Sequence, residues 1–306
     1  MTGCRARVIV VALTGVAATL STSHPNAQAG RTEANSSRTV YVSASRDPRA
    51  TPVTDLALQE FLLREDGQPR AILRVEPAVA PMQVAILVDD NGSGIFRSGL
   101  ARFIQRLQGQ AEFSLSSVTG QVLRIVDYTA NMTTLANGLV KMGVRPGTPD
   151  GGQLLEGILQ SAIDLRKREA QRGVILVLTV GGEEHSTVRA DFVLDEIVRS
   201  GAILHVVSVA RSALRSTVPI TTAASLLEEN LNLQEVLGEG PKQSGGRIVE
   251  SVASAGMFDG LQQIADELLH QYAVVYDRPG HVRSLPKLNV SVTRPGVQLR
   301  APSRTR

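Results

Sequence analysis

Cysteine and aromatic residues are nearly absent from this chain of 306 residues, which contains one cysteine, no tryptophan, six phenylalanines and four tyrosines. A single cysteine, Cys4, cannot form an intramolecular disulfide. With so few aromatic rings, a stacking platform for single-stranded nucleic acid is not expected. The hydrophobic core must therefore be built mainly from aliphatic side chains.

The chain also lacks a strong excess of either charge. It has 32 basic and 29 acidic side chains and a formal net charge of +3. Two of the arginines, Arg5 and Arg7, lie in a predicted leader, so the rest of the chain is close to neutral. This balance provides no electrostatic footprint for DNA or RNA. The fractions of hydrophobic residues (42%) and charged residues (20%) are typical of a globular protein.

Residues 1–29 have the pattern of a secretory signal peptide. Arg5 and Arg7 form a basic start, residues 8–20 are apolar, and residues 27–29 (Ala-Gln-Ala) offer a cleavage site after Ala29. The apolar run is too short to span a membrane comfortably. We therefore predict a secreted or periplasmic protein that has no membrane span after cleavage. Cys4 leaves with the leader, so the mature chain has no thiol chemistry.

Short β-strand patterns occur at both ends of the mature chain. Near the N-terminus they cover residues 39–43 and 71–75, with an Asp-Gly hairpin turn at residues 65–68. Near the C-terminus they cover residues 273–276, 288–292 and 297–299. We expect the two groups to pair with each other and form a small β unit.

Between these groups, strand and helix patterns alternate from about residue 81 to residue 272. Strands are expected at residues 84–88, 112–118, 122–128, 174–180, 203–209 and 247–252. Helices are expected at residues 95–107, 132–142, 153–172, 188–199, 223–237 and 256–271, with a glycine-rich loop before residue 246. The tight join at Thr119-Gly120 makes one strand pair antiparallel.

This alternation predicts an α/β fold: a Rossmann-like three-layer sandwich with a mostly parallel sheet. The predicted organisation is a leader (1–29), N-terminal β strands (30–80), an α/β domain (81–272) and C-terminal β strands (273–306). The segment from 211 to 246 is either a partner-facing insertion or the last covering helix of the sheet. His205, inside an apolar strand, is predicted to be a hydrogen-bonded core residue.

An oxygen-rich loop follows the first buried strand of the α/β domain. The stretch VAILVDDNGSG places Asp89, Asn91 and Ser93 two residues apart, so the three side chains can turn to one point. Hard oxygen donors of this kind suit a Mg²⁺-like cation. The same residue types also cap helix N-termini without any metal. The spacing alone leaves both readings open.

The order of strand, acidic Ser/Gly loop, helix, antiparallel strand pair and aliphatic strand resembles the von Willebrand factor A-type (VWA, integrin I-like) domain. The resemblance covers about residues 81–272. The flanks, with Val53-Thr54-Asp55-Leu56, Glu65-Asp66-Gly67-Gln68-Pro69 and the run from Ile264 to Tyr272, are similar to the bacterial "VWFA-related" group. The resemblance implies a Rossmann-like fold with a protein-binding face.

The resemblance also implies a metal-ion-dependent adhesion site, in which three loops hold Mg²⁺ or Mn²⁺ and a carboxylate of the ligand completes the shell. Carried over, the ligand positions fall on Asp89, Asn91, Ser93 and either Gln153 or Thr148. Asn91 replaces a serine of the motif, and Val180 stands where the third loop of the family has an aspartate. The implied site is therefore degenerate.

From these patterns we predict a non-catalytic adhesion or recognition module. Its partner is a protein and not a nucleic acid. Besides the metal positions, the partner face is expected to include the acidic residues Asp90, Asp150, Glu183 and Glu184. A metal-free scaffold of an envelope or extracellular assembly is the alternative. A hydrolase ranks last, because Gly92-Ser93-Gly94 lacks the spacing of a nucleophile elbow and the histidines show no metal-ligand spacing.

Overall fold

The computed structural model describes residues 36–46, 51–142, 152–209, 224–251, 254–278 and 285–305. The predicted leader and the loop that contains Thr148 and Asp150 lie outside the described residues. No helix among the described residues combines the length and the apolar character that crossing a bilayer requires.

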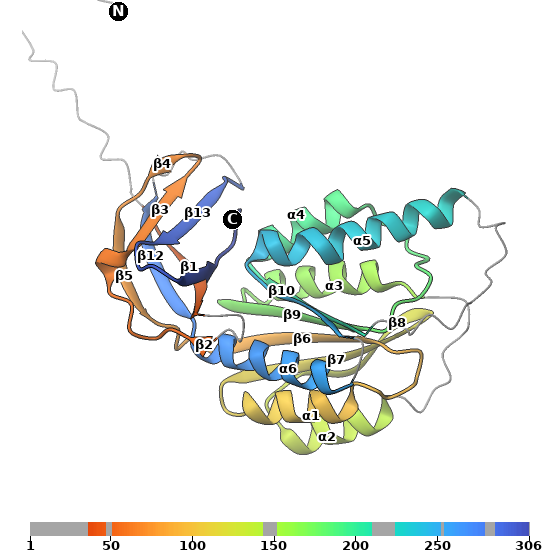
Figure 1. Ribbon diagram of the computed structural model, residues 1–306. Helices are drawn as coiled ribbons and strands as arrows, with labels where there is room; N and C mark the ends of the chain where they lie inside the picture. Colours follow the sequence, from red (N-terminus) through yellow and green to blue (C-terminus); the bar gives the residue numbers. More distant parts are fainter. Residues whose placement is uncertain are drawn as a thin grey trace, which may run out of the picture. The chain divides into compact units, whose positions relative to one another are not determined.

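A six-stranded sheet forms the centre of the α/β region (Figure 1). Its spatial order is β11 (Ile248–Ser251), β10 (Ile203–Val209), β9 (Arg172–Thr179), β6 (Met82–Asp89), β7 (Ala111–Thr119) and β8 (Gln121–Thr129). All neighbours are parallel except β7 and β8, which are joined by a tight turn. The predicted antiparallel edge strand is confirmed.

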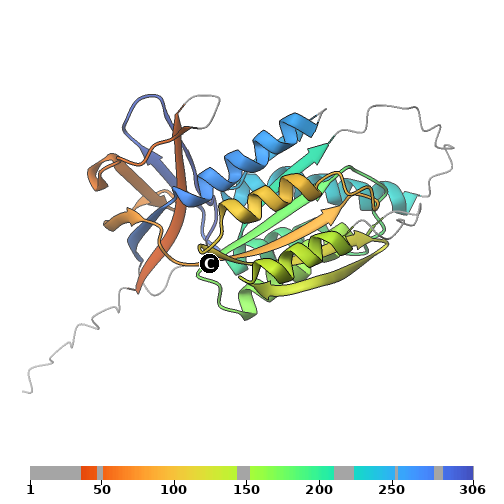
Figure 2. The same ribbon diagram turned by 90° about the horizontal axis from the view of Figure 1, so that it is seen from below.

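Among the described residues, helices cover both faces of this sheet (Figures 1 and 2). One face carries α1 (Arg97–Arg106), α2 (Met132–Lys141) and α6 (Ser254–Leu269), and the other carries α3 (Leu154–Lys167), α4 (Ala190–Ser200) and α5 (Ala224–Ser244). Alternate residues of β6 enter opposite cores: Ile86 packs with the first set and Leu87 with the second. Both faces are buried, which explains the continuous aliphatic runs in the sequence. The predicted three-layer α/β sandwich is confirmed.

Two predicted boundaries were wrong. The helix expected over residues 153–172 ends at Lys167, because Glu169 adopts a left-handed conformation (φ 52°) and the Ala170 N–H bonds back to the Leu165 carbonyl. The glycine-rich loop expected before residue 246 is instead the end of α5, which continues to Ser244 through Pro241. Packing against α4 and β10 stabilises this helix despite its glycines. For the described residues, the covering-helix reading of this segment is correct.

Strands from the two ends of the chain pair as predicted. One sheet contains β14 (Val297–Arg300), β1 (Ser36–Arg46), β12 (Tyr272–Arg278) and β5 (Ile72–Pro77), with β2 (Thr51–Pro52) on β1. A second sheet contains β13 (Leu288–Val292), β3 (Phe61–Glu65) and β4 (Gln68–Pro69), and η1 (Leu58–Glu60) precedes β3. Their inner faces share a core, in which the rings of Phe61 and Tyr272 meet edge to face with centroids 5.5 Å apart.

A buried arginine ties the start of β9 to neighbouring segments. Arg172 is 3% exposed, and its guanidinium donates to the carbonyls of Leu268 and Ala78 and to the side-chain oxygen of Gln271. Burial lowers its pKa to about 10. Since its donors are satisfied by neutral oxygens, this residue stabilises the fold through a hydrogen-bond network and not through an ion pair.

Candidate binding rim at the strand ends

Three short segments meet at the carboxyl ends of β6 and β9, and we call them together the rim: residues 89–95, residues 152–153 and residues 181–185. Asp89 and Thr179 are register partners at the ends of the two strands. The Thr179 hydroxyl donates to Asp89 Oδ2 at 2.7 Å, and the Val180 N–H donates to the Asp89 carbonyl at 3.0 Å. Asp89 is 8% exposed. Its carboxylate therefore joins two strands at the base of the rim.

Asp90 organises the first loop of the rim. Its Oδ1 accepts the Gly92 N–H at 3.0 Å, and its Oδ2 accepts the Gly94 N–H at 2.7 Å. Asn91 lies in the left-handed region (φ 52°), which asparagine tolerates better than most residues. Asp90 is 4% exposed and both of its oxygens face its own loop. The structure thus gives this residue a different role from the predicted partner contact.

Glu184 joins the second and third segments of the rim. Its two oxygens accept the N–H groups of Leu154 (3.1 Å) and Leu155 (3.3 Å) at the start of α3. Burial raises the pKa of Glu184 to about 8, and the two amide hydrogen bonds oppose that shift. The sequence predicted Glu184 on the partner face. In the structure its side chain is 1% exposed and holds two segments of the fold together.

The remaining rim side chains are accessible. Ser93 and Glu183 are exposed, and Asn91, Gln153 and His185 are half-buried. Glu183 Oε2 lies 3.9 Å from His185 Nε2. Gln153 is the N-cap residue of α3, but its side chain makes no capping bond. These residues form the polar surface that the rim offers to a ligand.

The resemblance implies Mg²⁺ or Mn²⁺ at the rim. The structure brings Asp89, Asn91, Ser93 and Gln153 to one end of the sheet, while Thr148 lies outside the described residues. Asp89 shares one oxygen with Thr179, and the oxygens of Asp90 and Glu184 bind amides. The described residues contain no group of three or more acidic, histidine or cysteine side chains suited to a metal. This donor set does not fit a resident divalent cation.

The Ser186 hydroxyl is not accessible to a substrate. Ser186 is 1% exposed and its hydroxyl accepts the Val188 N–H at 3.3 Å. His205 is also internal, as predicted: it is 2% exposed and its Nδ1 accepts the Arg247 N–H at 3.1 Å.

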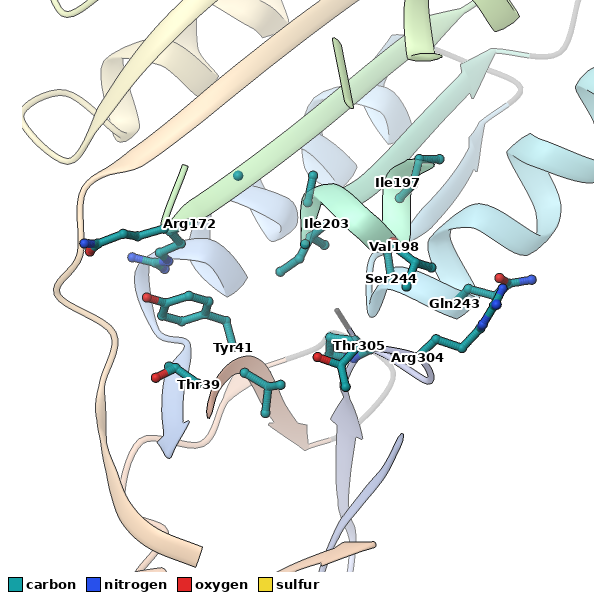
Figure 3. A pocket seen from close by; sticks show the side chains of 16 residues that line it. Thr39, Tyr41, Arg172, Ile197, Val198, Ile203, Gln243, Ser244, Arg304 and Thr305 are labelled. Carbon is teal, nitrogen blue, oxygen red and sulfur yellow. The ribbon is translucent and has the colours of Figure 1, made fainter. Parts of the chain in front are cut away.

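A cavity of about 60 Å³ lies at the other end of β9, and Figure 3 shows its lining. The Tyr41 ring lies beside the Arg172 guanidinium, 5.6 Å from the ring centroid. Arg304, on the opposite wall, pairs with Asp195 at 2.9 Å. Because both cations are engaged within the chain, this cavity is a weaker ligand site than the rim.

Two residues that hydrogen-bond to the rim were not identified from the sequence. Thr179 stands at the end of a predicted strand, and that position is the signal that could have identified it. Asn230, whose Oδ1 accepts the Glu184 N–H at 3.4 Å, comes from α5, 46 residues away. Nothing local in the sequence indicates that contact.

Comparisons with known proteins give structural likenesses only. No family model matches the chain, and no curated protein matches it. BatB from Bacteroides thetaiotaomicron is similar at 16% identity and a TM-score of 0.43, over 61% of this chain and 98% of BatB. The PilB minor pilin from Streptococcus sanguinis is 12% identical with a TM-score of 0.45, over 63% of this chain and 62% of that one. The SpRpn10 VWA domain is 8% identical with a TM-score of 0.42, over 60% and 95% of the two chains.

These likenesses concern chain arrangement and indicate nothing about ligands. The α/β region itself has the arrangement that the resemblance predicts: a six-stranded sheet with one antiparallel edge, helices on both faces and an acidic loop after β6.

Proposed function

We propose that this protein is a non-catalytic binding module that works outside the cytoplasm and holds a protein partner at the rim. The observation that carries the proposal is that some rim side chains are buried and bond within the chain, whereas others are exposed and available to a partner. Asp89, Asp90 and Glu184 are buried and bond the chain itself, whereas Ser93 and Glu183 are exposed.

This arrangement favours binding because the hydrogen bonds of the buried side chains fix the rim loops before a partner binds. The Asp90 carboxylate and the left-handed Asn91 hold the first loop in one conformation. Glu184 does the same for the second and third segments. A preformed surface loses little conformational entropy on association. Such a surface suits recognition without requiring any chemical step.

Exposed apolar side chains beside the rim favour a protein as the partner. Phe192 on α4 is 52% exposed and Leu231 on α5 is 55% exposed. Both belong to the segments that adjoin the third loop, since Asn230 bonds the Glu184 N–H and Asn232 bonds the Ala190 N–H. Large apolar side chains surrounded by polar ones are typical of protein interfaces.

The test is capture from the envelope and secreted fractions of the source organism, using the immobilised mature chain as bait. Ser93→Arg and Glu183→Arg change the rim, while Gln110→Arg places the same side chain at an exposed position immediately before β7. We expect the wild type and the Gln110→Arg control to capture the same proteins. Each rim variant is expected to capture at least about tenfold less of these proteins. An identical set of captured proteins for all four baits would contradict the proposal.

A metal-free scaffold is the second candidate. It is favoured by the number of rim carboxylates that serve internal bonds. A scaffold uses the domain as a rigid element, so it predicts that the rim variants capture the same proteins as the wild type. The same experiment therefore separates the two functions.

A further inference from the structure

The start of α3 is where the rim departs from a metal-binding arrangement. A helix N-terminus carries unpaired N–H groups and a partial positive charge, which favour an anion. In this protein that place is taken by the third segment of the rim, where the two side-chain oxygens of Glu184 accept the Leu154 and Leu155 N–H groups. We infer that the Glu184 side chain acts as a built-in clamp, so that the rim keeps its shape and binds its partner without a divalent cation.

The backbone supports the same link between the two segments. The Gly152 N–H donates to the Glu183 carbonyl at 3.0 Å, and the His185 N–H donates to the Gly152 carbonyl at 2.9 Å. Gly152 and Glu184 therefore form a short parallel bridge. A side chain at residue 152 would press on Val118, because a Cβ there would lie 3.0 Å from Val118 Cγ1 and 3.9 Å from Asp89 Oδ1. The clamp thus sits in a closely packed place.

The three buried acidic side chains of the rim are already engaged within the chain. Asp90 uses both oxygens in its own loop, Glu184 uses both at α3, and Asp89 shares one with Thr179. Val180 offers only an apolar side chain at the place where the resemblance predicts an aspartate. Mg²⁺ requires near-octahedral oxygen coordination and gives up its water reluctantly. Recruiting Glu184 to a cation would leave the Leu154 and Leu155 N–H groups without their partner.

The first test measures cation binding to the wild-type chain and needs no partner. Thermal unfolding is followed in EDTA and in 5 mM MgCl₂ or MnCl₂, and Mn²⁺ binding is followed by electron paramagnetic resonance. We expect the midpoint Tm to change by less than about 1 °C, because only a ligand that binds the folded state raises it. Saturable Mn²⁺ binding that raises Tm and is abolished by Asp89→Ala would overturn the inference.

The second test examines the clamp itself. Glu184→Ala removes both acceptors from buried N–H groups, and we expect Tm to fall by roughly 5–10 °C. Glu183→Ala, the matched control at the adjacent exposed acid, is expected to shift Tm by less than about 2 °C. Glu184→Gln keeps one acceptor and is expected to lie between them, which provides a measurable variant if Glu184→Ala does not fold. Equal Tm values for the Glu184 variants and the control would refute the clamp.

The statement about partner binding rests on the proposed function, whereas the two tests above do not. If captured proteins are lost on adding EDTA, this inference fails and the proposed function stands. If the rim variants capture the same proteins as the wild type while Mg²⁺ and Mn²⁺ leave Tm unchanged, the proposed function fails and the clamp stands.

Discussion

Acid should destabilise this protein through one buried histidine. Burial lowers the pKa of His205 to about 4; nearby Glu267 opposes that shift, and Arg247 and Arg300 add to it. Its Nδ1 accepts the Arg247 N–H, and its buried Nε2 has no hydrogen-bond partner among the described residues. The neutral ring fits this site, whereas a second proton would place a charge in a core.

The sign and size of the change in the free energy of unfolding with pH follow from proton linkage. In the unfolded chain His205 takes up a proton below pH 6.5, whereas in the folded protein it stays neutral until about pH 4. The unfolded state therefore binds more protons in this window, and stability falls as the pH falls. Between pH 7.5 and pH 5.0 the loss in the free energy of unfolding from this residue is about 2 kcal/mol.

The assay compares urea unfolding of the wild type and His205→Asn at pH 7.5, 6.5, 5.5 and 5.0. Asparagine keeps an acceptor in reach of the Arg247 N–H but does not titrate. Other groups change with pH as well: Glu184, with its pKa raised to about 8, favours the folded state less as the pH rises from 4.5 to 8. Such contributions are common to both proteins, so the decisive quantity is the difference between the two pH dependences.

We expect the wild type to lose about 2 kcal/mol more than His205→Asn between pH 7.5 and pH 5.0. The variant is expected to be less stable at pH 7.5 by about 1–3 kcal/mol, because the smaller side chain leaves a cavity. That offset does not affect the comparison of slopes. Parallel stability curves for the two proteins across the whole range would refute the reasoning.

Two further changes test the packing. Arg172→Lys should lower the free energy of unfolding by about 2–4 kcal/mol in urea denaturation, because an ammonium cannot reach all the carbonyls that the guanidinium satisfies; an unchanged midpoint would contradict this. Gly246→Ala should cost about 3 kcal/mol or more, since a Cβ would lie 1.8 Å from the Leu204 carbonyl oxygen. Its control, Gly238→Ala in the open part of α5, should stabilise the protein by about 0.5–1 kcal/mol. Similar thermal unfolding of the two alanine variants would show that the close approach at residue 246 is not real.

The architecture of the α/β region was predictable because its signals are local. Runs such as residues 84–88 and 174–178 are continuously apolar, and such runs are typical of strands covered on both faces. The turn at residues 119–120 is too short for a parallel crossover, so the antiparallel edge followed directly. The end of α5 was not predictable, because glycines and Pro241 weaken a helix locally and the packing that stabilises it comes from β10 and α4.

The sequence predicted where the candidate site lies, but it did not predict what each residue does there. The sequence by itself determined that Asp89, Asp90, Asn91 and Ser93 lie where a buried strand ends, since hydrophobic periodicity locates strand ends. Only the tertiary structure decided which carboxylates point inward. Glu183 and Glu184 are neighbours of the same type, yet one is exposed and the other clamps a helix 30 residues away in the chain. A side chain's partner depends on segments that folding brings together, and that information is not present in any local pattern.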